Sequence, residues 1–274
     1  MRGAAFLPVH RLQGGTVTPA RDWVAEEVPV ALEYNGISHA VMLATPLDLP
    51  DFALGFSLTE GILDGRCELY GVEEQPGDSG ITLRLEVSAA AMARLKERRR
   101  SMVGRTGCGL CGSETLAQVV RVLPAFVGSA RFTPKAMQRA MADLVEHQTL
   151  QRLTGAVHAA AWCMPDGGID LVREDIGRHN ALDKLVGAMV TARTDASTGF
   201  IAITSRASFE MVQKAALAGV GLLVAVSAPT TLAVATADTA GLTLAGFARE
   251  HGAVIYTHPG RIDLRATHES GDEY

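Results

Sequence analysis

Two cysteines separated by two residues, Cys108 and Cys111, are the side chains best suited to carry chemistry. They lie in the stretch Gly104–Gly112, where four glycines leave the backbone free to expose both thiols. Arg105 and the arginines at 98–100 come just before them. Nearby positive charge favours the thiolate, which is both the nucleophile and the metal ligand. The pattern therefore predicts two activated cysteines on a glycine-rich loop.

Three kinds of chemistry use such a pair. A structural zinc site needs four ligands, and the sequence has no second C-x-x-C and no H-x-x-x-H at suitable spacing, so zinc would have to be shared across a dimer. The zinc-water machinery of a nucleobase deaminase is missing, because here the cysteines precede His158, and Ala160 rather than a glutamate stands two residues after it. The residues alone leave shared zinc, dithiol–disulfide exchange and sulfur carriage as a persulfide open.

The amino-acid composition narrows the class of protein. The 274 residues are 47% apolar and 20% charged, with a formal net charge of −5, which does not favour nucleic acid or an anionic membrane. Residues 1–11 lack the apolar core of a signal peptide, and the longest apolar stretch, 215–228, is shorter than a bilayer span. We therefore expect a cytoplasmic protein with neither nucleic acid nor membrane among its partners. Cys163, in an apolar run, is expected to be an inert core cysteine.

The first half of the sequence is rich in short β runs. Residues 1–27 look like an irregular lead-in, and Asn35-Gly36 between two β-rich runs predicts a hairpin. A break near residue 130 suggests a β-rich N-terminal domain over 1–130, which carries the cysteine pair, and an α/β domain over 131–274. The strands expected in the first domain are 28–34, 39–44, 69–74 and 81–87, and its helices are 50–61, 89–100 and 114–122.

Strands alternate with helices in the second half. This alternation predicts βαβ units and a largely parallel sheet with helices on its faces. Asn180 and Ser208 are expected to cap helices, and His158, alone in an apolar strand, is expected to be a core histidine. The expected strands are 157–164, 168–172, 200–204, 222–226, 242–247 and 253–257, and the helices are 133–152, 180–191, 208–218 and 230–240.

Polar loops follow several of these strands, at 173–180, 204–208, 227–231 and 247–252. In open α/β sheets, ligands bind outside the carboxyl ends of the strands. Backbone N–H groups at a helix start, with Arg206 beside them, can receive a phosphate. The four loops together predict one rim that grips a polyanionic ligand, although neither a P-loop nor a Rossmann fingerprint is present.

Several motifs occur in combination: Gly104–Gly112, Glu174–Lys184, Thr204–Gln213 and Ala228–Arg249, together with the earlier Asn35-Gly36, Thr45-Pro46-Leu47-Asp48, Gly55-Phe56 and Glu60-Gly61. Together they resemble the FdhD family of formate dehydrogenase accessory sulfurtransferases. The resemblance extends from about Glu27 to Ile262. It implies an α/β fold with a C-terminal cytidine-deaminase-like α/β/α domain, a smaller β-rich N-terminal domain, a homodimer and no catalytic zinc.

The resemblance also implies an activity. A cysteine desulfurase would deliver sulfur to the first cysteine, Cys108, as a persulfide, with Cys111 as an assistant or second carrier. The protein would pass this sulfur to the molybdenum or tungsten bis(molybdopterin guanine dinucleotide) cofactor, which formate dehydrogenase then receives. The cofactor is thus a bound substrate, and no metal is expected to bind the protein directly. The alternatives are a cofactor-binding chaperone without sulfur transfer and a C-x-x-C dithiol oxidoreductase.

Two sets of residues are expected to hold the cofactor. The stretch that matches the family's cofactor-binding segment consists of Phe247, Ala248, Arg249, Glu250, His251 and Gly252. The positions chosen because they follow strands are Asp175, Arg178, His179, Ser205, Arg206 and Thr230.

Overall fold

The protein is described by a computed structural model that covers residues 2–100, 123–249 and 252–264. Cys108 and Cys111, together with Glu250 and His251, lie outside the described residues. The described chain forms three β-sheets with two, four and six strands.

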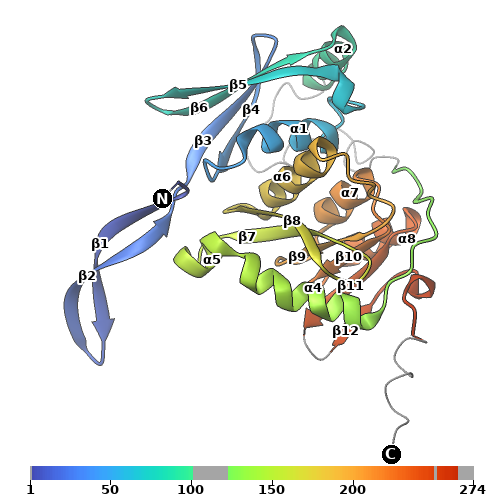
Figure 1. Ribbon diagram of the computed structural model, residues 1–274. Helices are drawn as coiled ribbons and strands as arrows, with labels where there is room; N and C mark the ends of the chain where they lie inside the picture. The colour runs from blue at the N-terminus through green and yellow to red at the C-terminus, as the bar shows by residue number, and fades with distance from the viewer. Residues whose placement is uncertain (1, 101–122, 250–251, 265–274) are drawn as a thin grey trace, which may run out of the picture.

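The N-terminal stretch is a long β-hairpin, so the prediction of an irregular lead-in is wrong. β1 (Ala4–Gln13) pairs antiparallel with β2 (Thr16–Ala25), and both residues of the Gly14-Gly15 turn have positive φ, as a tight hairpin turn requires. Prolines at positions 8 and 19 argue against strands in the sequence, although proline is tolerated on edge strands. Figure 1 shows the hairpin extending away from the rest of the molecule.

A four-stranded sheet follows, with strand order β4-β3-β6-β5. One face carries buried alternate residues such as Val30, Leu32 and Leu83, which pack with helices α1 and α2. The predicted Asn35-Gly36 hairpin is confirmed, with both residues at positive φ. The elements are β3 (Val28–Tyr34), β4 (Ile37–Ala44), α1 (Leu49–Thr59), η1 (Arg66–Glu68), β5 (Leu69–Gly77), β6 (Gly80–Val87) and α2 (Ala89–Arg100).

The six-stranded sheet has the order β12-β11-β10-β9-β7-β8. The prediction of a largely parallel sheet holds for β9, β10 and β11, but β7 is antiparallel to both of its neighbours and β12 is antiparallel to β11. The short connections after β7 and β11 account for this, because only antiparallel strands can be joined by a tight turn. The strands are β7 (His158–Cys163), β8 (Ile169–Asp175), β9 (Phe200–Ile203), β10 (Leu222–Ala225), β11 (Thr243–Arg249) and β12 (Gly252–Ile255).

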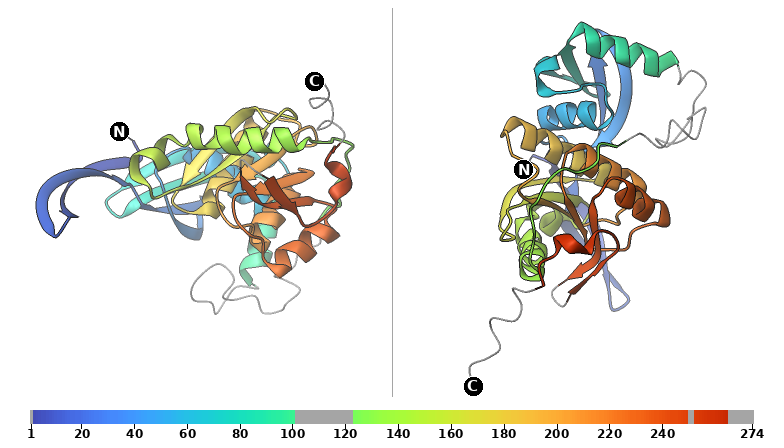
Figure 2. Two further views of the ribbon diagram at one scale, coloured as in Figure 1. Left: turned by 90° about the horizontal axis from the view of Figure 1, so that it is seen from below. Right: turned by 90° about the vertical axis from the view of Figure 1, so that its right-hand side faces the viewer.

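Helices cover both faces of this sheet (Figure 2). Residues that alternate along the strands separate into two cores, one against α6, α7 and α8 and the other against α4. Cys163 is fully buried in the second core, where burial raises the pKa of its thiol, as expected for an inert cysteine. The helices are α4 (Pro134–His147), α5 (Thr149–Thr154), α6 (Arg178–Thr191), α7 (Phe209–Leu217), α8 (Thr231–Thr239) and η2 (Pro259–Arg261).

Among the described residues, no helix is long and apolar enough to cross a membrane. The single helix predicted over 133–152 is two helices, α4 and α5, because Gln148 between them leaves the helical conformation with φ −80° and ψ 75°.

Helices α1 and α6 join the two larger sheets through a backbone-to-backbone crossing. A Cβ atom at Gly55 would overlap the carbonyl oxygen of Asp183, and one at Gly187 would overlap the carbonyl oxygen of Asp51. Only glycine permits this approach on either helix. The domain boundary near residue 130 stays a prediction.

We expect Gly187→Ala to lower the free energy of unfolding by about 3 kcal/mol, because the new methyl group forces α1 and α6 apart. Urea denaturation measures the change. Gly65→Ala is the matched control, since a Cβ there meets only Cys67 Sγ at 3.9 Å and should change stability little. Equal stability of the two variants would contradict a tight crossing.

Candidate functional site

The polar loops gather at one edge of the six-stranded sheet. β8, β9, β10 and β11 run in the same direction, so their carboxyl ends meet at this edge. Hydrogen bonds between loops tie the edge together: Thr230 N donates to Ala207 O at 3.2 Å, and Phe247 N donates to Ser227 O at 3.3 Å. The loops predicted to lie together do so, and we call residues 176–179, 204–208, 226–230 and 247 the rim.

The buried carboxylate of Asp175 fixes the start of α6. Its Oδ2 accepts hydrogen bonds from Thr45 N at 3.0 Å and Thr45 Oγ1 at 2.9 Å, and it lies 2.7 Å from Lys184 Nζ. Its Oδ1 accepts from Gly177 N at 2.8 Å and from Asn180 Nδ2 at 3.0 Å. The prediction that Asp175 touches the cofactor is wrong, because the side chain is fully buried and both oxygens are engaged. Asn180 is not the helix cap either: it lies inside α6, and Gly177 is the N-cap.

A second buried charge pair joins α1, α6 and α7. Lys214 Nζ donates to Asp183 Oδ1 at 2.8 Å, to Thr59 Oγ1 at 2.9 Å and to Glu60 Oε1 at 3.2 Å. Burial alone would lower the pKa of Lys214, but the carboxylates of Asp183 and Glu60 raise it. Sequence reasoning missed this pair, although a lysine inside the apolar run 211–217 was a signal, since lysine is almost never buried unless paired.

Polar atoms without partners lie where α6 and α7 begin. His179 Nε2 lies 2.9 Å from Glu210 Oε2, and this close contact joins the two helices and lowers the pKa of the Glu210 carboxyl. Within the described chain, Arg178 Nε, Ser208 Oγ and Gln213 Oε1 are buried and have no hydrogen-bond partner. Buried polar atoms are nearly always paired in native proteins, so these atoms point to a missing polar ligand or to water.

His158 lies beside the rim and not in the core, so the expectation of a core histidine is wrong. It is the first residue of β7 and pairs with Asp175, the last residue of β8, which places it at the carboxyl edge. The side chain is half-buried. Burial lowers the pKa of His158, and the neighbouring charges of Arg178 and His179 lower it further. The side chains of His158, Arg178 and His179 thus lie close to one another.

The stretch predicted to bind the cofactor enters the rim through a strained residue. Phe247 has a φ of +52°, in a β-bulge between Gly246 and Arg249, and the residue is 48% exposed. Non-glycine residues in this left-handed conformation are uncommon and often mark functional positions. The side chain of Ala248 is buried in the core, which leaves only its backbone for a ligand, whereas Arg249 is exposed.

The remaining predicted residues have different exposures. Ser205 is buried, and its Oγ donates to Arg206 O at 3.0 Å, whereas the side chain of Arg206 is exposed at the rim. Thr230 caps α8, since its Oγ1 accepts from Ala233 N at 3.2 Å. Ser208 occupies the N-cap position of α7 but makes no capping hydrogen bond, which leaves its hydroxyl as one of the unpaired atoms above.

No group of three His, Cys, Asp or Glu side chains in the described part of the chain is arranged to hold a metal ion. The rim is instead suited to an anion, because Arg178 and Arg206 supply positive charge beside helix starts.

Comparison with known proteins identifies the family. The family model described as FdhD/NarQ matches residues 25–263, most of the chain. The chain belongs to the FdhD/NarQ family. This confirms the resemblance seen in the sequence motifs.

Relatives cover the chain almost end to end. A protein of Variovorax paradoxus named sulfur carrier protein FdhD is 63% identical over 260 residues, which are 95% of this chain and 94% of the relative. A protein of Bordetella petrii with the same name is 54% identical and covers 95% of both chains. A solved structure from Desulfotalea psychrophila, described as a formate dehydrogenase accessory protein, has a TM-score of 0.73 at 20% identity and covers 95% of this chain and 99% of its own. That structure confirms a shared mixed α/β fold.

The position of His158 in this FdhD/NarQ protein predicts how its side chain titrates. We expect the imidazole of His158 to titrate below the ordinary value of 6.5, because burial and the neighbouring Arg178 guanidinium disfavour its charged form. Arg178→Gln should raise the pKa of His158 toward that value. Histidine-selective NMR over a pH series measures both. The control is Arg152→Gln, at an exposed arginine on α5, which should leave the His158 titration unchanged. An unchanged His158 titration would contradict the placement of Arg178.

Proposed function

We propose that the protein is a sulfur carrier that takes persulfide sulfur from a cysteine desulfurase and passes it to a bis(molybdopterin guanine dinucleotide) cofactor required by formate dehydrogenase. Relatives named sulfur carrier protein FdhD, at 63% and 54% identity, support the sulfur chemistry. The observation that carries the proposal for the cofactor is the carboxyl edge of the six-stranded sheet, where Arg178 and Arg206 lie in loops of the rim and Arg178 Nε, Ser208 Oγ and Gln213 Oε1 have no partner among the described residues.

The proposed chemistry at the cysteines balances for one transfer, after which a thiol reductant has to reopen the disulfide. The Cys108 thiolate attacks the terminal sulfur of the desulfurase persulfide, and the desulfurase cysteine leaves as a thiolate. The sulfur then resides on Cys108 as a persulfide. Release of this sulfur as hydrosulfide needs two electrons, which the Cys111 thiolate supplies when it attacks Cys108 Sγ and closes a Cys108–Cys111 disulfide. This disulfide-forming step explains why a second cysteine, Cys111, lies three positions after Cys108.

The rim is the proposed site for the cofactor, which is the substrate of the transfer. Its guanine dinucleotide arms carry diphosphate groups that guanidinium forks can bind with two hydrogen bonds each. Arg178 and Arg206 are the side chains proposed for this role, and the exposed ring of Phe247 is the proposed surface for a guanine base. Contacts from Arg249, Glu250, His251, Gly252 and Thr230 belong to the same proposal.

The proposed assembly includes a homodimer and transient complexes with a cysteine desulfurase and a formate dehydrogenase, in the cytoplasm. A cytidine-deaminase-like arrangement of the second half also belongs to the proposal, and the strand order β11-β10-β9-β7-β8 supports it. A shared zinc site is not proposed, because sulfur transfer needs the thiolates free.

Sulfur loading tests the carrier proposal directly. After incubation with a cysteine desulfurase and cysteine, we expect intact-protein mass spectrometry to show a gain of one sulfur atom that a reductant removes. Cys108→Ala should abolish the gain. Cys67→Ser, at an exposed cysteine remote in sequence from the pair, should retain it.

The same samples separate the alternatives. If no variant gains sulfur but all still activate formate dehydrogenase, the chain is a cofactor chaperone. A Cys108–Cys111 disulfide that exchanges with thiols, with no sulfur gain in any sample, would identify a dithiol oxidoreductase.

Nucleotide binding tests the rim separately. We expect guanosine diphosphate to bind the wild type in isothermal titration calorimetry, with affinity reduced roughly tenfold by Arg206→Gln, through loss of charge-assisted hydrogen bonds. Phe247→Ala should weaken binding by a similar factor, through loss of base stacking, which is worth about 1–3 kcal/mol. The control is Arg152→Gln on α5, which removes another exposed arginine, one paired with Glu146. Unchanged affinity for guanosine diphosphate in both rim variants would show that the rim is not the cofactor site.

A further inference from the structure

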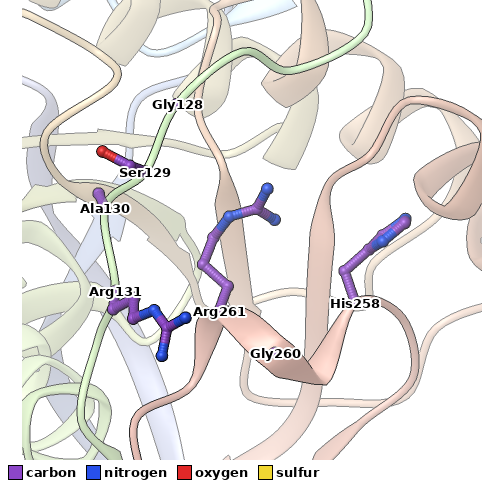
Figure 3. Close-up of a pocket in the computed structure, with 7 residues that line it drawn as sticks. All are labelled: Gly128, Ser129, Ala130, Arg131, His258, Gly260 and Arg261. Carbon is purple, nitrogen blue, oxygen red and sulfur yellow. The ribbon is translucent and has the colours of Figure 1, made fainter.

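An open cavity of about 380 Å³ lies at the opposite edge of the six-stranded sheet. Segment 128–131 forms one wall, and His258, Gly260 and Arg261 form the other (Figure 3). Arg261 reaches the carbonyl oxygens of Gly221 and Gly241, which come just before β10 and β11. The cavity is therefore at the amino ends of these strands, away from the rim at their carboxyl ends.

Arg261 is held rigidly in the cavity wall. Its Nη1 donates to Gly221 O at 3.0 Å, Gly241 O at 3.0 Å and Thr243 Oγ1 at 2.8 Å. Its guanidinium carbon lies 4.6 Å from the centre of the Phe126 ring, a cation–π contact. In the described part of the chain its Nε and Nη2 make no hydrogen bond. Two donor nitrogens of a fixed guanidinium are thus available to a ligand.

The backbone register places a second arginine beside it. Phe132 and Ile262 form a parallel β-bridge, and both side chains lie in the core. Arg131 and Arg261 directly precede these two residues, and both line the cavity. Figure 3 shows both side chains entering the space between the two walls.

The positive charge in this cavity is not neutralised by the described residues. No ion pair joins Arg131 or Arg261 to a carboxylate in residues 2–100, 123–249 and 252–264. Burial lowers the pKa of Arg261, which reflects the desolvation of its charge. His258 adds a third nitrogen group, although its Nε2 is already 3.0 Å from Asp238 O and 3.5 Å from Asp238 Oδ1.

We propose that this cavity binds a phosphoryl group, as inorganic phosphate or on a small phosphomonoester. Guanidinium forks match the geometry of phosphate oxygens, and two of them converge here from adjacent backbone segments. The amides of Ser129, Ala130 and Arg131 donate no hydrogen bond within the described chain, so they offer further donors. The volume is at the lower end of small-molecule sites, which suits a small ligand rather than a dinucleotide.

This site is independent of sulfur transfer and of the rim. Its function does not require the cysteines or the guanine dinucleotide, and it can exist whether or not the proposed function is right.

A ¹H–¹⁵N NMR titration with inorganic phosphate tests the site. We expect the amides of Ser129, Ala130 and Gly260 to shift in the wild type, and Arg131→Gln to weaken binding at these amides roughly tenfold. Arg131 is exposed and unpaired among the described residues, so this variant should fold. Arg152→Gln, also an exposed arginine, should leave the shifts unchanged. Arg206→Gln should remove any phosphate binding at the rim without affecting these three amides.

Parallel titrations with glycerol 3-phosphate and succinate identify the chemistry. Binding of glycerol 3-phosphate more tightly than inorganic phosphate would indicate a phosphomonoester ligand, and the reverse order would indicate free phosphate. Succinate binding as tightly as either would overturn the assignment to a phosphoryl group. Shifts confined to the rim, or wild-type affinity at Gly260 in Arg131→Gln, would overturn the site itself.

Discussion

The buried carboxylate of Asp175 is the interaction on which the arrangement of the rim depends. It receives donors from Thr45, at the end of β4, from Gly177 and Asn180 at the start of α6, and from Lys184 one turn further along α6. Hydrogen bonds to a carboxylate have a preferred geometry, so these donors fix both the angle and the rotation of α6. Arg178 and His179, in the first turn of that helix, take their positions from it. The first half of the chain thus sets the geometry of a site built in the second.

The crossing of α1 over α6 adds a steric constraint to this electrostatic one. Gly55 and Gly187 let the backbones touch, and the Lys214–Asp183 pair lies alongside, with Thr59 and Glu60 of the α1 end completing its hydrogen bonds. Glu210, one turn before Lys214 on α7, contacts His179. A displacement of α1 would therefore reach the rim through α6 and α7 together. This coupling explains why the two larger sheets act as one support for the site.

Much of this arrangement could be predicted from the sequence. The polar loops after consecutive strands had to meet at one edge wherever those strands were parallel, and the Asn35-Gly36 hairpin follows from turn chemistry alone. The burial of individual polar side chains could not be predicted from the sequence in the same way. Asp175 and Arg178 are both polar residues in one loop, yet the first is enclosed and the second borders the rim, and only the packing of Thr45 against β8 distinguishes them. The apolar strand around His158 predicts a core position for this residue, whereas its pairing with Asp175 places it at the edge of the sheet.

The two buried ion pairs are better explained by positioning than by stability. Removing two charges from water costs several kcal/mol per ion, and well-packed apolar residues of similar volume often stabilise a fold as much or more. An apolar side chain in place of Asp175 could fill its volume, but it could not orient the amide of Gly177 and the side chain of Asn180 at the same time. Since those groups determine where Arg178 and His179 lie, the charge pair has its main consequence at the rim. The energetic cost of burying Lys184 and Asp175 is thus the cost of a preorganised anion site, which need not rearrange when its ligand arrives.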